Sequence, residues 1–286
     1  MAALLLLPLA AGCAAASGPS RDTVRPPTSA SPLRLAAGEA PVLPLDRLFW
    51  SDQEYATLHA ALDVLTRRCM EQARLPMPPG SRRPMARGPR AAHRYGIIDD
   101  AEAKRYGYHG APLPPPPPAP RLSTAQLAAL TGTQPGRPSP RGVPAEGCNG
   151  WAARQITGTT SYPVDHETVR RLDSESFELS LKDPRTRRVI AAWVDCMEAA
   201  DATHAASPDQ KPPALRGTEP TAEEIRTARV DVACKEKTGL VGLWAGVESA
   251  YQQQMLRDGA SAVQDIERER RQQLKAAARA LQGGSR

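Results

Sequence analysis

The chain is poor in aromatic residues, with 4 Trp, 6 Tyr and 2 Phe among its 286 residues. Its clearest apolar run, Ala2–Ala11, has half of the roughly 20 residues that a transmembrane helix needs. The composition also lacks the Gly-X-Y period of collagen and the charged, periodic character of a long coiled coil. A multi-span membrane protein, a collagen and a coiled-coil rod are therefore excluded.

Sequence motifs of the common enzyme classes are also missing. The chain has no GxSxG, SxxK, HExxH, P-loop or GxGxxG, and His166-Glu167 is followed at position 170 by Arg rather than by His. The five histidines are dispersed, so we expect them on the surface or partly packed; a metal site assembled in three dimensions is the alternative. The sequence therefore predicts no catalytic residue, no metal ligand and no cofactor.

Proline is abundant, with 29 residues beside 21 Gly, and much of it is clustered. Such clusters do not fit a packed core, so we do not expect one compact globule of 286 residues.

The N-terminus resembles that of an exported lipoprotein. Met1–Ser20 holds no charged residue, and its apolar run has the length of a secretory h-region. The run ends in Leu9-Ala10-Ala11-Gly12-Cys13, which resembles a bacterial lipobox, although Ala10 replaces the preferred Leu and no Lys or Arg precedes the run. We expect a signal peptide over 1–12 and lipid on Cys13; an ordinary signal peptide is the alternative. Residues 13–44 have the composition of a disordered tether.

The remaining cysteines are Cys69, Cys148, Cys196 and Cys234, without any CxxC or CxxCH. Redox dithiols and haem attachment lack their signature, and in an exported chain two disulfides are the simplest reading. Pairing of sequence neighbours predicts Cys69–Cys148 and Cys196–Cys234; four buried thiols are the alternative.

Apolar residues repeat at helical spacing, and capping residues precede them. Ser51 and Glu54 form a capping box for a helix that ends before Pro76. The other predicted helices are Asp100–Arg105, Cys148–Ile156, one capped by Asp165, one beginning at Pro184, a long one over 222–257 and a last one over 261–282. The last two should form an antiparallel hairpin, because the break at Gly259 is short. The predicted fold is all-α: a disulfide-stapled helical bundle over 45–282, with flexible Pro-rich insertions at about 76–94, 110–147 and 203–220.

Positive charge is concentrated in one segment. Residues 67–94 contain eight Arg and one Glu, a net charge of +7 in a chain of net +6. We expect the loop arginines to bind anionic lipid or a wall polymer, and not nucleic acid, since no aromatic residue is interleaved before Tyr95. The candidate residues are Arg74, Arg82, Arg83, Arg87 and Arg90. A solvated linker is the alternative.

Tyrosines gather around the second predicted helix, at Tyr95, Tyr106 and Tyr108, with His109 beside them. They are candidates for the lining of a ligand groove. The alternative is that they cover the core of a domain short of large side chains.

Several of these features together resemble a family of lipoproteins of unknown function from high-GC, Streptomyces-like actinobacteria. The resemblance covers roughly residues 50–110 and 145–282. It rests on the lipobox, the helical Cys69-Met70, Tyr95-Gly-Ile with Tyr106-Gly-Tyr, Gly147-Cys148, and Val232-Ala-Cys-Lys-Glu-Lys followed by Trp244, Glu248 and Tyr251. It implies an extracytoplasmic location and no particular activity.

We therefore expect a lipoprotein on the extracytoplasmic face of the membrane, or a secreted protein, that binds or scaffolds without catalysing a reaction. The alternative is an envelope enzyme of hydrolase type, with a site assembled from scattered Asp, Glu and His. A pocket in which a His and a carboxylate converge would favour that alternative.

Overall fold

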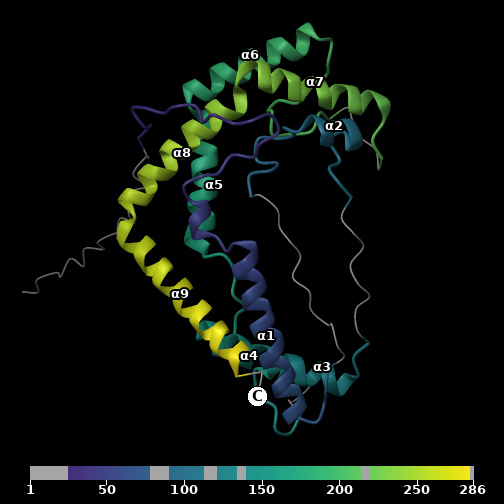
Figure 1. The fold of residues 1–286 in the computed structure, drawn as a ribbon, viewed down its shortest axis with the longest axis vertical. Coiled ribbons are helices and arrows are strands. Elements are labelled where there is room, and N and C mark those ends of the chain that lie inside the picture. The colour runs from purple at the N-terminus through teal and green to yellow at the C-terminus, as the bar shows by residue number, and fades with distance from the viewer. Residues whose placement is uncertain (1–24, 78–89, 113–120, 134–139, 214–218, 284–286) are drawn as a thin grey trace, which may run out of the picture.

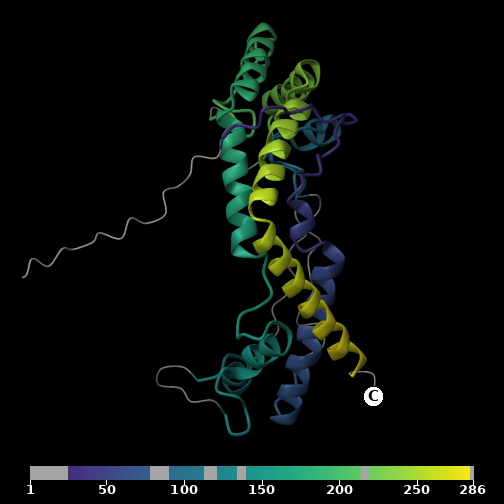
Figure 2. The ribbon, with the colours of Figure 1, turned by 90° about the vertical axis from the view of Figure 1, so that its left-hand side faces the viewer.

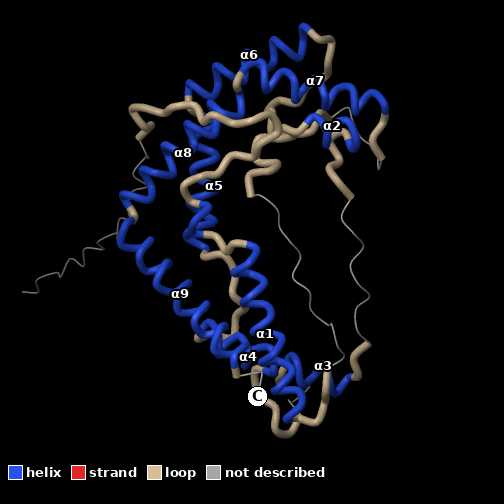
Figure 3. Tube along the Cα trace, in the orientation of Figure 1, coloured by secondary structure: helices blue, strands red, loops and turns tan. Residues whose placement is uncertain are grey.

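The computed structural model describes residues 25–77, 90–112, 121–133, 140–213 and 219–283. Within these ranges the chain forms α-helices, one short 3-10 helix and no strand (Figure 3), which confirms the all-α prediction. Cys13, Arg82, Arg83 and Arg87 lie outside the described residues.

The molecule is elongated, and its helices gather toward two ends (Figure 1). At one end α1 (Asp52–Gln72), α3 (Thr124–Thr131) and α4 (Gly147–Thr157) pack with α9 (Ala260–Gln282). At the other, α2 (Asp100–Tyr106), α6 (Pro184–Ala199) and α7 (Ala222–Thr238) pack with one another and with α8 (Leu240–Asp258). Helix α5 (Glu167–Lys182) lies along α8. Because α8 and α9 are consecutive, they connect the two ends.

Each end has one disulfide, and both pairings are those predicted. Cys69–Cys148 joins α1 to α4, and Cys196–Cys234 joins α6 to α7. A short helix η1 (Asp46–Leu48) and the start of α9 contribute a further apolar cluster with Val169 of α5, between the ends.

Several helix boundaries follow from local sequence as expected. Ser51 and Glu54 cap α1 reciprocally, and Asp99 and Asp183 cap α2 and α6. The expected cap of α5 is wrong by one residue: His166 is the N-cap, while Asp165 accepts a hydrogen bond from the backbone N–H of Trp50 at 3.0 Å.

The predicted antiparallel hairpin is not formed. The helix expected over 222–257 divides at Gly239, whose left-handed backbone (φ 65°, ψ 24°) ends α7 and begins α8. Beyond Gly259, α9 bends away from α8 and packs on α1 and α4 (Figures 1 and 3). Since Leu274 and Ala277 of α9 find apolar partners on α1 and α4, the chain does not fold back.

The tether and the insertions also differ from expectation where they are described. Residues 25–44, which we name the strap, lie on the helices: Leu33 N donates to Gly242 O of α8 at 2.8 Å, and Leu43 is buried. The insertion 110–147 contains α3, and Pro208 in the third insertion accepts a hydrogen bond from buried Lys235. Local composition does not reveal these tertiary contacts.

No helix among the described residues has the length and apolar character required to cross a membrane.

Candidate functional site

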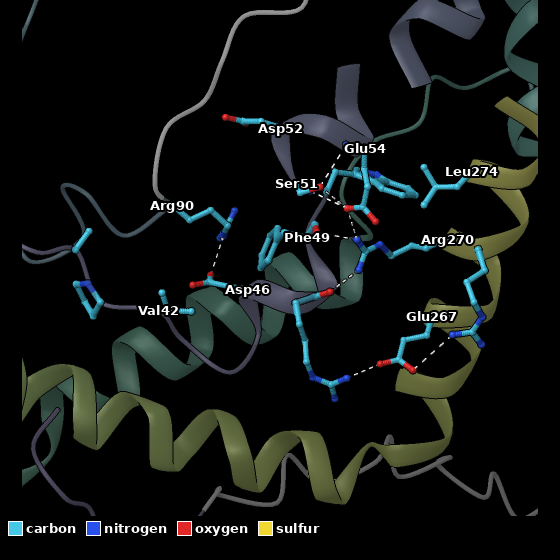
Figure 4. A pocket seen from close by; sticks show the side chains of 15 residues that line it. Val42, Asp46, Phe49, Ser51, Asp52, Glu54, Arg90, Glu267, Arg270 and Leu274 are labelled. Carbon is cyan, nitrogen blue, oxygen red and sulfur yellow. Dashed lines mark hydrogen bonds and ion pairs between the residues drawn. The ribbon is translucent and has the colours of Figure 1, made fainter. Parts of the chain in front are cut away.

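A large, open groove of about 920 Å³ lies between the start of α1 and the middle of α9 and is here called the α1–α9 groove. Its walls come from the end of the strap, from η1 and the following residues up to Glu54, and from α9; Arg90 closes one side (Figure 4). The two aromatic residues of this region, Phe49 and Trp50, are almost completely buried and form its base.

Arg270 holds one side of the groove together. Its Nη2 donates to Phe49 O and to Glu54 Oε2, each at 2.9 Å, and its guanidinium lies 4.7 Å from the centre of the Trp50 ring. The same Glu54 oxygen accepts from Ser51 N at 2.9 Å. The carboxylate that caps α1 therefore also binds α9 to the start of α1 (Figure 4).

Arg90 holds the opposite side of the α1–α9 groove together. Its Nε lies 3.2 Å from Asp46 Oδ1 and its Nη2 lies 3.1 Å from Asp173 Oδ2, while its guanidinium covers the Phe49 ring at 3.1 Å from the centroid. Arg90 is thus bound within the protein, so it is less available to a membrane or polymer than the sequence suggested.

The charges of the groove balance. Four Arg and four carboxylates line it: Arg47, Arg90, Arg270 and Arg271 with Asp46, Asp52, Glu54 and Glu267. Glu267 pairs with both Arg47 and Arg271. The groove therefore presents hydrogen-bond donors and acceptors in equal measure, with Val42, 80% exposed, as an apolar edge. The arrangement suits a polar ligand without net charge better than an anion.

The arginines that flank the predicted basic loop also have internal partners. Arg67 pairs with Asp63 at 2.7 Å, Arg68 donates to Gly283 O, and Arg94 pairs with Glu248. Arg74 stands exposed just beyond α1 with a left-handed φ of 57°. Three of the eight arginines of this segment, Arg67, Arg90 and Arg94, are therefore paired with carboxylates inside the fold.

The tyrosine cluster belongs to the core. Tyr95 is fully buried and donates to Glu248 Oε2 at 2.8 Å, and Tyr108 donates to Asp231 Oδ2 at 3.1 Å. Burial and the neighbouring Glu248 raise the pKa of Tyr95; burial and Asp231 raise the pKa of Tyr108. Tyr95 therefore covers the core, as the alternative had it, whereas Tyr108 is half-buried and lines a smaller pocket together with His109.

Asp231 lies in a second buried network. It accepts from Trp193 Nε1 at 2.8 Å and from Lys235 Nζ at 3.2 Å, and Lys235 also donates to Ile97 O and Pro208 O. Burial raises the pKa of Asp231 and lowers the pKa of Lys235, while their ion pair opposes both shifts. With side chains 2% and 1% exposed, the pair is out of reach of a substrate.

A smaller pocket of about 240 Å³ is lined by His93 and His109 with Glu102 and Asp209, and His109 also pairs with the buried Glu224. His109 Nδ1 lies 2.8 Å from Glu224 Oε1, which also accepts from Tyr108 N at 2.9 Å and lies 3.5 Å from Lys211 Nζ. Thr221 caps α7 by accepting from Glu224 N, while the Glu224 side chain turns toward His109. No Ser, Thr or Cys lines the described part of this pocket.

A metal centre is not indicated. Across the described ranges, no group of three or more His, Cys, Asp and Glu side chains is placed to hold a metal ion.

The sequence indicates only some of the residues that line the α1–α9 groove. Ser51 and Glu54 mark a helix start in the sequence, but Arg270, whose side chain is 14% exposed on the packed face of α9, is one of many charged residues in that helix and carries no signal of its own. No protein-family model, curated protein or solved structure gives a significant match to the chain.

Proposed function

We propose that the chain is a lipid-anchored protein of the extracytoplasmic face that binds a neutral, hydroxyl-rich polymer such as wall glycan in the α1–α9 groove. Two disulfides between helices are typical of chains that fold in an oxidising, extracytoplasmic compartment. The lipobox-like Leu9–Cys13 and the resemblance to actinobacterial lipoproteins support the anchor at Cys13.

One observation carries the binding role: the groove is large and open, and its arginines are paired with its own carboxylates. Such a surface offers many hydrogen bonds to hydroxyl groups and no net charge to attract an ion. Its paired groups also leave no evident free nucleophile, which favours binding over catalysis.

The anchor is tested by expressing the full-length chain in an actinobacterium. We expect a mature protein that begins at Cys13, carries the mass of attached lipid and partitions into detergent. We expect a Cys13→Ser variant to carry no lipid and to stay out of the detergent phase. A mature wild-type chain with unmodified Cys13, or one cleaved elsewhere, contradicts the anchor.

The groove is tested by sedimentation of the protein with purified cell wall. The double variant Arg47→Ala/Arg271→Ala changes side chains that are 55% and 69% exposed, and we expect at least a tenfold loss of binding. The matched control, Lys275→Ala/Arg279→Ala, changes exposed residues farther along α9. Equal binding by both variants and wild type would exclude the groove as the binding site.

A second candidate function, an envelope hydrolase, is favoured by the pairing of His109 with Glu224. A carboxylate that orients His in this way prepares the ring to remove a proton from water. In that case, cell wall incubated with the protein releases soluble fragments, and His109→Ala abolishes the release. If wild type releases none, this candidate is rejected.

A further inference from the structure

The strap enters the structure beside the junction of α5 and α6. Arg185 Nη2, near the start of α6, donates to Pro27 O at 3.1 Å. From there the strap reaches α8, where Leu33 N bonds to Gly242 O. A Cβ at Gly246 would lie 2.2 Å from Ser31 O, and one at Gly242 would lie 2.5 Å from Leu33 O. The two glycines thus allow the strap to lie directly against the helix, which fixes where the N-terminal segment leaves the helices.

Basic side chains surround this point. Within 182–188, four of the seven residues are Lys or Arg, and Arg25 begins the described chain. We name these residues the exit patch: Arg25, Lys182, Arg185, Arg187 and Arg188.

Few acidic groups oppose the exit patch. Asp183 is buried and holds Arg185, with its Oδ2 2.8 Å from Arg185 Nη2. Glu178 pairs loosely with Lys182 at 3.8 Å, and both of these side chains are 69% exposed. No ion pair of Arg25 or Arg187 is found within the described residues. The two carboxylates leave the patch with a net charge of +3.

The positive charge of the exit patch lies where it does not stabilise α6. Three arginines occupy the first five residues of α6, where the positive end of the helix dipole favours acidic side chains. Arg185 pairs with Asp183, and Arg188 Nε donates to Pro184 O at 3.3 Å, but no ion pair of Arg187 or Arg188 is found within the described residues. The exposed charge of Arg187 and Arg188 thus requires another explanation.

The short distance between the exit patch and the anchor at Cys13 supplies an explanation for this exposed charge. Arg25 is 12 positions after Cys13 in the sequence. Even a fully extended chain of this length reaches at most about 43 Å. Because the strap holds residues 25–44 on the helices, a lipid on Cys13 keeps the exit patch within this distance of the headgroups.

We infer that the exit patch docks on the anionic headgroups of the membrane that holds the lipid anchor. This inference rests on the proposed lipidation of Cys13. Attraction between the patch and anionic lipid acts over about 8–10 Å at physiological salt, and a short tether strengthens docking because it keeps the patch near the surface. Docking presents the α5–α6 junction to the membrane and leaves the far end of α9, with α1 and α4, directed outward (Figure 2).

The test uses an unlipidated chain that begins at residue 13 and carries Cys13→Ser, so that it does not depend on lipidation in the cell. Sedimentation is measured with vesicles of equal phosphatidylglycerol and phosphatidylcholine, and with phosphatidylcholine alone, at 50 and 300 mM salt. Each basic residue held at an anionic surface raises partitioning about fivefold. We expect binding to the anionic vesicles only, and weaker binding at the higher salt.

The patch variant changes Arg25, Lys182, Arg187 and Arg188 to Gln and keeps Arg185, because Arg185 supports Asp183. We expect at least a tenfold loss of binding. A second variant, Glu178→Gln, removes an opposing charge and should raise binding severalfold, which a damaged fold would not do. The control variant changes four exposed basic residues of α8 and α9 to Gln and should bind like wild type: Arg257, Arg268, Lys275 and Arg279.

A rival variant changes four arginines of the predicted basic loop to Gln: Arg74, Arg82, Arg83 and Arg87. If this variant loses binding and the patch variant does not, the loop is the docking surface and the inference is wrong. Equal binding to both kinds of vesicle, or no binding at 50 mM salt, also overturns it. Whether Cys13 is lipidated is determined in a separate experiment, by the intact mass of the protein purified from cells.

Discussion

Arg94 and Glu248 form a buried ion pair, with Arg94 Nε 3.0 Å from Glu248 Oε1. The pair joins the segment before α2 to the middle of α8, 154 residues apart in sequence. Glu248 also accepts from Tyr95, Ser176 and Gln252, and Arg94 reaches Asp173 as well. Burial by itself lowers the pKa of Arg94, but Glu248 and Asp173 raise it above its ordinary value, so Arg94 stays charged. The network therefore fixes α5, α8 and the segment before α2 in one arrangement.

Removing the Glu248 carboxylate should destabilise the fold strongly. In Glu248→Ala, Arg94 loses its principal partner while its side chain remains only 15% exposed. We expect the free energy of unfolding to fall by about 3–5 kcal/mol, measured by urea denaturation with the disulfides intact. Arg47→Ala, which breaks a pair whose arginine is 55% exposed, is the control and should cost less than about 1 kcal/mol. Equal losses would show that burial does not set the strength of these pairs.

The sequence predicts the parts of this fold that depend on neighbouring residues. Ser51 with Glu54 marks the start of α1 because both groups of the capping box lie within one turn. The disulfides follow from the pairing of cysteines that are neighbours in the sequence, Cys69 with Cys148 and Cys196 with Cys234.

The direction that a helix takes after a turn, and the contacts between segments far apart in the sequence, do not depend on neighbouring residues alone. The turn at Gly259 permits either a hairpin or a bend, and the choice depends on α1, which offers α9 a larger apolar surface than α8 does. The sequence predicts a tether where the strap lies, because the strap contacts Gly242 and Gly246 through backbone atoms. Such contacts leave no apolar repeat in the sequence. Arg270 in the groove and Arg94 in the core look alike in sequence, because their carboxylate partners lie more than 100 residues away.

Asp183 should make stability depend on acidic pH. The hydrogen bond from Arg185 lowers the pKa of Asp183 below its ordinary value of 3.8. The folded chain therefore releases this proton more readily than the unfolded chain, so the stabilisation is complete above pH 3.8 and is lost as the pH falls through the lower, folded-state pKa.

Asp183→Asn tests this dependence because it keeps an N-cap for α6 and removes the charge. We expect a loss of about 1.5–3 kcal/mol at pH 7 that shrinks as the pH falls below 3.8, measured by urea unfolding from pH 3 to 7. Asp100→Asn is the control, since Asp100 pairs with Arg229 at the exposed surface. A difference between wild type and Asp183→Asn that is constant with pH would contradict the assignment.

Tyr251 should ionise late in an alkaline titration. Burial and the nearby Asp183, whose Oδ2 accepts from the Tyr251 hydroxyl at 3.3 Å, raise the pKa of Tyr251 to about 12. A folded-state pKa above that of the unfolded chain means that the stabilisation is present below pH 10 and is lost as the pH rises toward 12. In a titration followed at 295 nm, Tyr251→Phe should remove a component near pH 12. Loss of a component near pH 10 would instead indicate an accessible Tyr251.

Each disulfide should contribute to stability by an amount that grows only slowly with the length of the loop that it closes. The loops span 79 and 38 residues, for which chain entropy predicts about 4 kcal/mol each. We expect Cys196→Ser/Cys234→Ser and Cys69→Ser/Cys148→Ser each to lower the free energy of unfolding by 2–4 kcal/mol, because native strain and residual structure reduce the ideal value. Peptide mapping without reduction provides the control, and a peptide that links Cys69 to Cys196 or Cys234 would refute the pairing.

Gly246 should control the attachment of the strap. Since a Cβ there would lie 2.2 Å from Ser31 O, Gly246→Ala forces the strap away from α8. Alanine also favours a helix over glycine by about 0.5–1 kcal/mol, so α8 itself should not weaken. We expect trypsin to cleave after Arg34 at least tenfold faster in this variant, while the midpoint of thermal unfolding changes by a few degrees at most. Gly259→Ala is the control, because its added Cβ would meet only Met255 O, at 3.2 Å. Cleavage at the wild-type rate would mean that the strap is held by contacts other than those with Gly242 and Gly246, and the short tether inferred for the anchored protein would then need another cause.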